Sequence, residues 1–367
     1  MIAILTSGVA LGAYVPGLLL ARRLNESGTA ARVDVLERLF PGPIRDRIQV
    51  NRRLFHRDFR LARAAHALAR DQRNLLDADL TARLLEEWTG SGVSTVVVFS
   101  GFWAPVVDAY QRTTLGLRVE RCHVDAIHSP SFQAGGDIAG AGDVWLMDSR
   151  RGTVDITIPV SGEPVIPWAD REPRMLVHGG GWGMGTFLTD AQRLARGGVQ
   201  LDVVAHERAD ITFRDGTRYF TSDPDWQPWS DGGFPPFGEV RGDGSVGYRA
   251  ATRCPASFDL VRQGIAVVSK PGAGTLLDSL HAATPMILLE PLGEWEEHNG
   301  RLWQRNGFAV SLDEWCSRGR PLELLGDLHR NLLRARSATP SYADRFLEGG
   351  AVPGESPAPR TRGRSQR

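Results

Sequence analysis

Short runs of β-branched and aliphatic residues alternate with longer segments of helical period throughout the first half of the chain. Between the second and third of these runs lies a long helical region, 51–88, and we interpret its arginines from Arg52 to Arg73 as a solvated face. Fully apolar strands separated by helices are typical of a parallel sheet, so the pattern predicts a Rossmann-like α/β layer. The strands are predicted at residues 2–5, 32–36, 95–99, 118–123 and 143–147.

The second half of the chain repeats this order. A predicted strand at 174–178 is followed by a glycine-rich loop at 179–186 and a predicted helix at 187–196. The stretch 206–256 is polar and rich in aromatic residues, with only part of it regular, so we expect binding loops or a lid there. Further strands are predicted at 200–205, 265–268 and 286–289.

These patterns divide the chain into two α/β domains. A segment rich in proline, glycine and aspartate, 148–170, has the composition of an interdomain linker. We therefore expect one domain at 1–165 and a second at 170–348. The remaining residues, 349–367, are rich in proline, serine and arginine and predict a disordered tail.

Composition narrows the range of partners and compartments. The 43 basic and 43 acidic residues balance, so no net field favours nucleic acid or an anionic membrane. The three cysteines, far apart and odd in number, fit a reducing cytoplasm better than a disulfide framework or a zinc site. Residues 1–21 are uncharged, but they lack a basic leader and are interrupted by glycines and a proline. We expect a cytoplasmic protein without an integral membrane span, and composition does not predict its oligomeric state.

The segment 269–278, Ser-Lys-Pro-Gly-Ala-Gly-Thr-Leu-Leu-Asp, joins a predicted strand to a short predicted helix. Such a turn directs backbone N–H groups and a helix N-terminus at one point, which suits a diphosphate. Lys270, the only lysine in the chain, could place an ammonium group there, although Arg249 and Arg253 compete for this role. In the structural alternative, Lys270 is solvated, Thr275 caps the helix and Asp278 closes a capping box.

Polar residues after the next strand favour a ligand site, because open α/β sheets bind ligands at the carboxyl ends of their strands. The pattern Gly-x-Gly-Thr-x-x-Asp, followed by Glu-Pro and by Arg-Asn-Gly-Phe-Ala at 305–309, resembles the donor-binding region of GT-B glycosyltransferases. Within that superfamily it is most similar to the UDP-N-acetylglucosamine transferase that makes lipid II. The residues placed in this candidate donor site are Gly180, Gly181, Lys270, Gly272, Gly274, Thr275, Asp278, Glu290, Glu296 and Asn299.

The resemblance implies two Rossmann-like domains facing across a cleft, the GT-B architecture. It implies that the backbone of 272–275 holds the diphosphate, that Asp278 binds the donor ribose, and that polar residues near Asn299 read the sugar hydroxyls. It also implies a nucleoside-diphosphate sugar and a small-molecule acceptor as partners, with no cofactor and no metal. Two segments, 6–16 and 100–105, are similar to the acceptor-side loops of the family, and 178–186 to the loop that opens its donor domain. The residues taken from the acceptor-side loops are Gly8, Gly12, Tyr14, Ser100, Phe102 and Trp103.

The chain departs from the family at one catalytic position. Many members have a histidine three residues before the proline of the first loop, and this chain has Ala13. Either another residue is the base, or the acceptor needs none, or the chemistry has been altered or lost. We expect His123 and Asp125 to replace it, since two residues at this spacing on a strand share a face and the aspartate raises the basicity of the imidazole. The alternatives are a structural His123 at a strand end, or Tyr14, whose ordinary pKa of about 10 keeps it protonated.

The acidic pairs Asp77–Asp79 and Asp223–Asp225 imitate the metal-binding D-x-D of another glycosyltransferase fold, but neither follows a predicted strand. The resemblance therefore implies a glycosyltransferase of the hexosyl or N-acetylhexosaminyl class with a natural-product-like acceptor. The resemblance implies a metal-independent, inverting reaction, with UDP among the candidate nucleotides. The alternatives are a nucleotide-sugar 2-epimerase and, given Ala13, a non-catalytic sugar-nucleotide-binding homologue.

Overall fold

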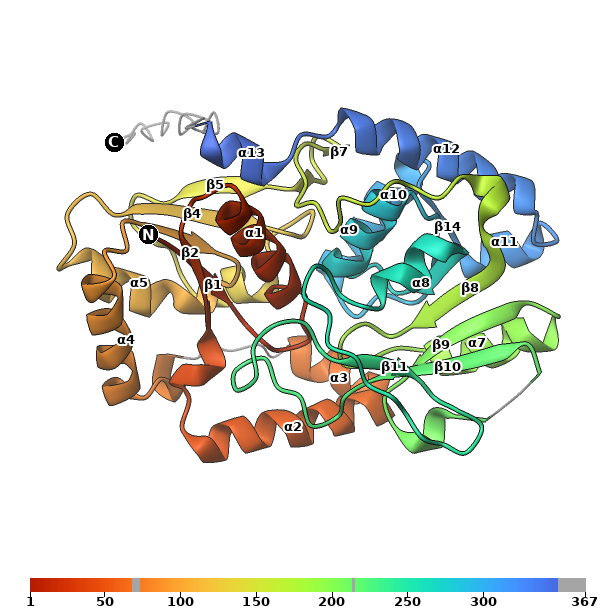
Figure 1. Cartoon of the computed structure of the whole chain (residues 1–367), viewed down its shortest axis with the longest axis horizontal. Helices are drawn as coiled ribbons and strands as arrows, with labels where there is room; N and C mark the ends of the chain where they lie inside the picture. The colour runs from red at the N-terminus through yellow and green to blue at the C-terminus, as the bar shows by residue number, and fades with distance from the viewer. Residues whose placement is uncertain (68–72, 213–214, 349–367) are drawn as a thin grey trace, which may run out of the picture.

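Two separate β-sheets, one from each half of the chain, organise the protein (Figure 1). The computed structural model describes residues 1–67, 73–212 and 215–348. The first sheet is parallel throughout, in the order β2-β1-β3-β4-β5. Its strands are β1 (Ile2–Thr6), β2 (Ala31–Val35), β3 (Thr95–Val98), β4 (Arg118–His123) and β5 (Gly142–Trp145).

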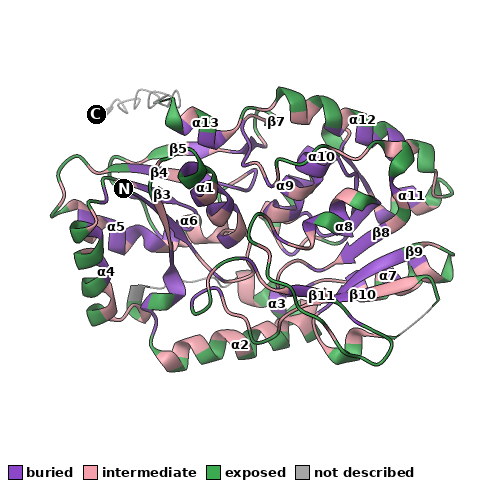
Figure 2. Cartoon of the chain, in the orientation of Figure 1, coloured by how far each residue is buried: buried purple, intermediate pink, exposed green. Residues whose placement is uncertain are grey.

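Helices cover both faces of this sheet, and successive strand residues alternate between the two faces. Ile4 of β1 packs in the same core as Leu20 of α1, whereas Leu5 packs with Trp88 and Trp103 on the opposite face. Figure 2 shows the strands buried between helices whose outer faces are exposed. The helices of this half are α1 (Tyr14–Glu26), α2 (Gly42–Arg57), α3 (Phe59–Ala67), α4 (Ala78–Gly90), α5 (Ala104–Gln111) and α6 (Pro130–Ala134).

The predicted long helical region, 51–88, is built from parts of three helices. The backbone of Asp58 is extended at the end of α2, and α3 then begins in a new direction before α4 returns to the sheet. In Figure 1, α2 and α3 extend from the first sheet toward the second half. Ion pairs from Arg57 to Glu207 and from Arg63 to Glu290 join these two helices to the second half.

The second sheet has the order β11-β10-β9-β8-β12-β13-β14, and only β11 at its edge is antiparallel. β10 and β11 lie within 206–256, where we expected loops, so part of that stretch extends the sheet. The strands are β8 (Glu172–His178), β9 (Gln200–Ala205), β10 (Thr217–Ser222), β11 (Phe237–Glu239), β12 (Gly264–Ser269), β13 (Met286–Leu288) and β14 (Ala309–Ser311). The helices are α7 (Phe187–Arg196), α8 (Phe258–Gln263), α9 (Ala273–Ala282), α10 (Glu294–Arg305), α11 (Leu312–Ser317) and α12 (Leu322–Ala338).

Two smaller features connect the halves. A two-stranded hairpin, β6 (Met147–Asp148) and β7 (Thr153–Val154), lies in the predicted linker. After α12 the chain returns to the first half, where α13 (Tyr342–Leu347) packs beside α1 (Figure 1). The Tyr342 hydroxyl donates to the Glu120 carboxylate of β4. The predicted tail, 349–367, lies outside the described residues, and the domain limits stay a prediction.

In the described part of the chain, no helix combines the length and the apolar character needed to cross a membrane.

Candidate active site

A cavity of about 740 Å³ lies between the two halves. Its walls come from the carboxyl ends of strands in both sheets, which is where open α/β sheets place their ligands. From the first half, the segments after β1, β3 and β4 reach it; from the second, the segments after β8, β9, β10 and β12. Of the predicted site residues, those that line it are Gly8, Gly12, Ser100, Phe102, Asp125, Gly180, Gly181, Lys270, Gly272, Gly274, Thr275, Asp278 and Glu296.

The glycine loops of the two halves touch across this cavity. A Cβ atom on Gly181 would lie 2.7 Å from the carbonyl oxygen of Ala10, so only glycine permits the approach. Ala10 and Leu11 have left-handed backbones, with φ of 58° and 64°, at a cost of about 1–2 kcal/mol each. The buried Glu37 carboxylate stabilises this first loop, since it accepts the Gly8 N–H at 2.8 Å. The acceptor-side loop is therefore held in one unusual shape.

The N-terminus of α9 forms part of the cavity wall, and no side chain caps it. The N-cap is Gly272 and the helix begins at Ala273, so Thr275 lies inside the first turn. The predicted capping box of Thr275 with Asp278 is consequently wrong. Uncapped N–H groups at the positive end of a helix dipole favour an anion.

The Asp278 carboxyl lies one turn further along the same wall. Burial raises its pKa from 3.8 to about 7. The described residues offer this carboxyl no hydrogen bond, whereas buried carboxyls are ordinarily satisfied within the protein. It is thus available to a ligand hydroxyl.

Lys270 is buried and forms an ion pair with the buried Glu296, so the predicted alternative of a solvated lysine is wrong. The second oxygen of Glu296 accepts the Leu292 N–H at 2.7 Å. This pair contributes no net charge to the cavity. Burial and then the nearby Lys270 ammonium lower the pKa of His178 to about 4, so this cavity residue is neutral.

Arg52 of α2 also lines the cavity, which corrects our interpretation of it as part of a solvated face. Burial and the neighbouring Arg53 lower its pKa, and no carboxylate among the described residues pairs with it. Arg52 therefore gives the cavity a positive charge that no described residue neutralises. Glu290, in contrast, is exposed, pairs with Arg63 and does not line the cavity, so the structure separates it from the other donor-side residues.

Asp125 and Asn299 meet from opposite halves of the protein. Asp125 follows β4 and lines the cavity, and its Oδ1 accepts a hydrogen bond from the Asn299 amide at 2.8 Å. Burial raises the pKa of Asp125 to about 6, while the Asn299 hydrogen bond opposes the rise. The other amide hydrogen of Asn299 is donated to the Pro271 carbonyl at 3.0 Å. Asn299 does not line the cavity and has no donor left for a sugar hydroxyl, contrary to its predicted role.

His123 does not pair with Asp125, so the predicted dyad is wrong. β4 ends at His123, the chain then turns, and the same-face relation of a strand is lost. The imidazole Nε2 bonds to Asp143 at 2.7 Å, and the ring stacks on Trp145 with centroids 4.0 Å apart. His123 is 1% exposed and does not line the cavity. It fits the structural alternative of a hydrogen-bonded residue at a strand end.

Two predicted acceptor-side residues lie behind the cavity wall. The Tyr14 hydroxyl donates to the Gly233 carbonyl at 2.9 Å, and burial raises its pKa far above the ordinary value. The Trp103 indole donates to the Thr6 carbonyl at 2.8 Å. Both are fully buried, so they support the loops of the site without facing a ligand.

Besides Arg52 and His178, two further cavity histidines were not among the predicted site residues. His66 comes from α3, packs with its ring 5.5 Å from that of Trp295, and makes no hydrogen bond to a described residue. Burial and Lys270 lower the pKa of His66. His206 follows β9, and burial together with Arg52 lowers its pKa to about 3. A lone histidine in an amphipathic helix or at a strand end gives no sequence signal that it faces a cavity.

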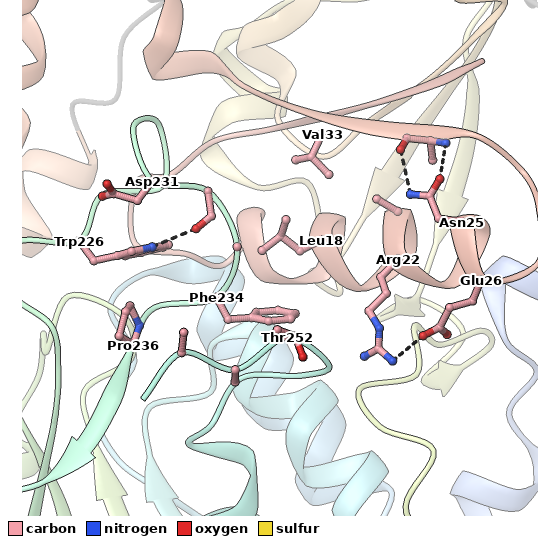
Figure 3. Close-up of a pocket in the computed structure, with 16 residues that line it drawn as sticks. Leu18, Arg22, Asn25, Glu26, Val33, Trp226, Asp231, Phe234, Pro236 and Thr252 are labelled. Atoms are coloured by element: carbon pink, nitrogen blue, oxygen red, sulfur yellow. Dashed lines mark hydrogen bonds and ion pairs between the residues drawn. The ribbon is translucent and has the colours of Figure 1, made fainter. Parts of the chain in front are cut away.

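A second, more open hollow of about 920 Å³ lies between α1 and the loops after β10 and β11 (Figure 3). Leu18, Phe234 and Pro236 give it an apolar floor, and Trp226 lines both hollows. Its charged side chains at α1, Arg22 and Glu26, pair with each other. It therefore lacks the converging polar groups of the cavity between the halves, which we take as the candidate active site. In the described residues, no three histidine, cysteine or acidic side chains are grouped to hold a metal ion.

Several solved structures that are similar to this protein are glycosyltransferases. SsfS6 from Streptomyces sp. SF2575 matches 95% of this chain over 99% of its own length, with 16% identity and a TM-score of 0.54. The spinosyn rhamnosyltransferase SpnG matches 95% of this chain over its full length, with 14% identity and a TM-score of 0.55. SsfS6 has also been solved with thymidine diphosphate, in a form with 15% identity and a TM-score of 0.56. No protein-family model and no curated protein matches the sequence.

At these identities the likeness establishes the fold. The protein has the GT-B architecture, two Rossmann-like halves facing across a cleft, and the predicted fold class is confirmed. The resemblance to GT-B glycosyltransferases, which we inferred from the glycine turn and its flanking residues, is confirmed at the level of the fold.

Proposed function

We propose that this protein transfers a hexosyl or N-acetylhexosaminyl group from a nucleoside-diphosphate sugar to a small, natural-product-like acceptor. The observation that carries the proposal is the wall built by α9. An uncapped helix N-terminus and a carboxyl with no hydrogen bond to a described residue, Asp278, stand one turn apart and face the predicted acceptor-side loops of the other half. This spacing suits a diphosphate and the ribose that follows it.

The donor is expected to lie along the second half. Its diphosphate accepts N–H groups from the first turn of α9, and its ribose hydroxyls donate to Asp278. Pro255 and Ser257 line the adjoining part of the wall and are available to the nucleobase. The deoxythymidine nucleotide is the first to test, because SsfS6 and SpnG, which share the fold, have been solved with thymidine diphosphate. Arg52 supplies a positive charge for an anionic group of either substrate.

The proposed reaction is a metal-independent direct displacement, as the resemblance implies. The acceptor oxygen forms a bond to the anomeric carbon while the bond from that carbon to the diphosphate oxygen breaks. The nucleoside diphosphate leaves with the bonding electrons, and the positive end of α9 stabilises the charge that develops on it. Attack opposite the leaving group inverts the anomeric configuration. The acceptor proton passes to a base on the first half.

We assign the base to Asp125, the member of the predicted pair that lines the cavity. Its pKa of about 6 leaves it mostly ionised at neutral pH yet able to take a proton. His66 is the competing candidate, since its neutral ring lines the same cavity from α3. The variants D125N and H66Q separate the two. We expect D125N to lower kcat by at least about 100-fold, the usual contribution of a general base, and H66Q to retain most activity.

The first experiment is a thermal-shift screen with TDP, UDP and GDP and their glucose conjugates. We expect TDP or UDP to raise Tm and D278N to remove most of the shift. No stabilisation by any nucleotide would refute the donor site. Each stabilising sugar nucleotide is then incubated with a panel of phenolic acceptors, and nucleotide release and glycoside formation are followed. Epimerisation of the donor without an acceptor, or binding without turnover, would instead support the two alternative functions.

A further inference from the structure

The Asn299 side chain joins three segments from both halves of the protein. Its Oδ1 accepts the Ala126 N–H of the first half at 2.8 Å. Its amide nitrogen donates to Asp125 of the first half at 2.8 Å and to the Pro271 carbonyl of the second half at 3.0 Å. Pro271 belongs to the turn that leads into α9. One amide therefore ties the loop that carries Asp125 to the loop that precedes the diphosphate wall.

Burial makes these bonds costly to lose. Asn299 is 0% exposed and Asp125 is 7% exposed. A buried donor or acceptor left without a partner costs about 1–3 kcal/mol. Only an amide of this length offers two donors and an acceptor at once; aspartate has the shape but no donor when ionised.

We propose that Asn299 is a positioning residue that holds the Asp125 carboxylate in a fixed relation to the α9 turn, so that base and leaving-group site form one unit across the cleft. This inference rests on the proposed function, in which Asp125 is the base. This positioning role takes the place of a direct contact with the sugar hydroxyls, which the family resemblance implies for polar residues near Asn299. The loop that carries Asp125 would take the acceptor proton, and the turn into α9 would bind the departing diphosphate. The Asn299 side chain holds these two loops in place relative to each other.

The charged groups that act on Asp125 are Glu296 and Lys270, which pair with each other, and the amide dipole of Asn299. Burial and Glu296 raise the pKa of Asp125, whereas Asn299 and Lys270 lower it. His66 also lies within the electrostatic reach of Lys270. Removing the amide donor should therefore raise the pH at which Asp125 ionises, while Asp278 and the first turn of α9 make no hydrogen bond to Asn299.

Lys270, the single lysine of the chain, provides a direct probe of the Asp125 titration and of how Asn299 affects it. Protein labelled with 13C and 15N lysine gives one side-chain spin system, that of Lys270, and its shifts should show a step near pH 6. D125N should lack this step, which assigns it to Asp125. N299A should move the midpoint upward by about one pH unit, and N299D further, because it adds a like charge. Q304A removes an exposed amide from the same helix and should leave the midpoint unchanged.

Turnover gives the second measurement. In N299D the acid limb of the kcat profile should shift upward with the spectroscopic midpoint, while KM for the sugar nucleotide stays within about 2-fold. N299D keeps an acceptor for the Ala126 N–H, so it decides the matter if N299A fails to fold. An unchanged midpoint in a folded N299D overturns the proposal, and a raised donor KM with an unshifted pH profile restores the sugar-reading role. Failure of every sugar nucleotide to react would count against the proposed function alone, since the lysine titration needs no turnover.

Discussion

Replacing Asp278 by asparagine is expected to make the protein more stable while it loses affinity for a nucleoside diphosphate sugar. The carboxyl is half-buried in the cavity wall, and desolvation there raises its pKa from 3.8 to about 7. The folded state therefore binds this proton more tightly than the unfolded state does. Stability contributed by the neutral carboxyl is lost as the pH rises from about 4 to about 7, and it stays constant above that range. D278N has no carboxyl at this position, so its stability does not decrease in this way as the pH rises.

The magnitude follows from the shift of about 3 pKa units. At 1.36 kcal/mol per unit, the ionised carboxyl destabilises the folded state by at most about 4 kcal/mol at neutral pH. Asp278 lies on a cavity that opens to water, which reduces the effect, so we expect D278N to exceed the parent protein by about 2 kcal/mol at pH 8 and by less at pH 5. Its affinity for TDP should fall by about 10-fold or more, the value of one or two charge-assisted hydrogen bonds.

Urea unfolding at pH 5, 6.5 and 8 measures the stability of D278N and of the parent protein. Titration calorimetry with TDP at pH 8 measures their affinity for the nucleotide. D327N is the matched control, because Asp327 is exposed on α12 and pairs only with a neighbouring arginine. Its stability should follow that of the parent at every pH. If D278N and the parent lose stability in parallel between pH 5 and pH 8, burial of this carboxyl is not the source of the loss. If TDP binds both equally, Asp278 does not contact the nucleotide.

G181A should lower stability by about 1–3 kcal/mol, because its Cβ would lie 2.7 Å from a carbonyl oxygen of the first loop, whereas G12A, with no atom within 4 Å, should change little in the same thermal melts. G274A should stabilise α9 by up to about 1 kcal/mol and yet weaken TDP binding, since its Cβ enters space that is open only without a diphosphate; unchanged affinity would place the diphosphate elsewhere. Burial lowers the pKa of His56, but hydrogen bonds to Asp210 and a backbone carbonyl raise it overall. The protonated His56 ring therefore stabilises the contact between the halves below about pH 6.5, and this contribution is lost as the pH rises through the folded pKa. In thermal melts at several pH values, H56Q should lack this decrease in Tm with rising pH.

Most of the fold could be predicted because both sheets are built from strands buried on two faces. Such strands are continuous apolar runs, and β1, β3 and β12 were readily found this way. β10 was not, because its sequence, Thr-Arg-Tyr-Phe-Thr-Ser, carries polar residues and lies near the sheet edge. β14 has only three residues, too few to show a period.

The donor wall was predictable because its residues are adjacent in sequence, from Lys270 to Asp278. The acceptor side was harder, since it assembles from distant segments. The period of α2 separates a polar face from an apolar one, but it cannot tell water from a polar cavity, so Arg52 was interpreted as solvated. The pairing of His123 with Asp125 failed for a different reason: the strand ends at His123, two residues before Asp125, so the two side chains do not share a strand face.

The return of α13 to the first half bears on how the two halves of this fold can be exchanged between proteins. A chimera that exchanges the whole second half, from before β8 to the end of the chain, would part Tyr342 from Glu120, a buried hydrogen bond, and Phe346 from Arg118, which lies 4.8 Å above its ring. The exchanged half would then dock its last helix on a foreign surface. A workable hybrid needs two crossovers, one before β8 and one after α12, so that residues 342–347 stay with the first half on which they rest.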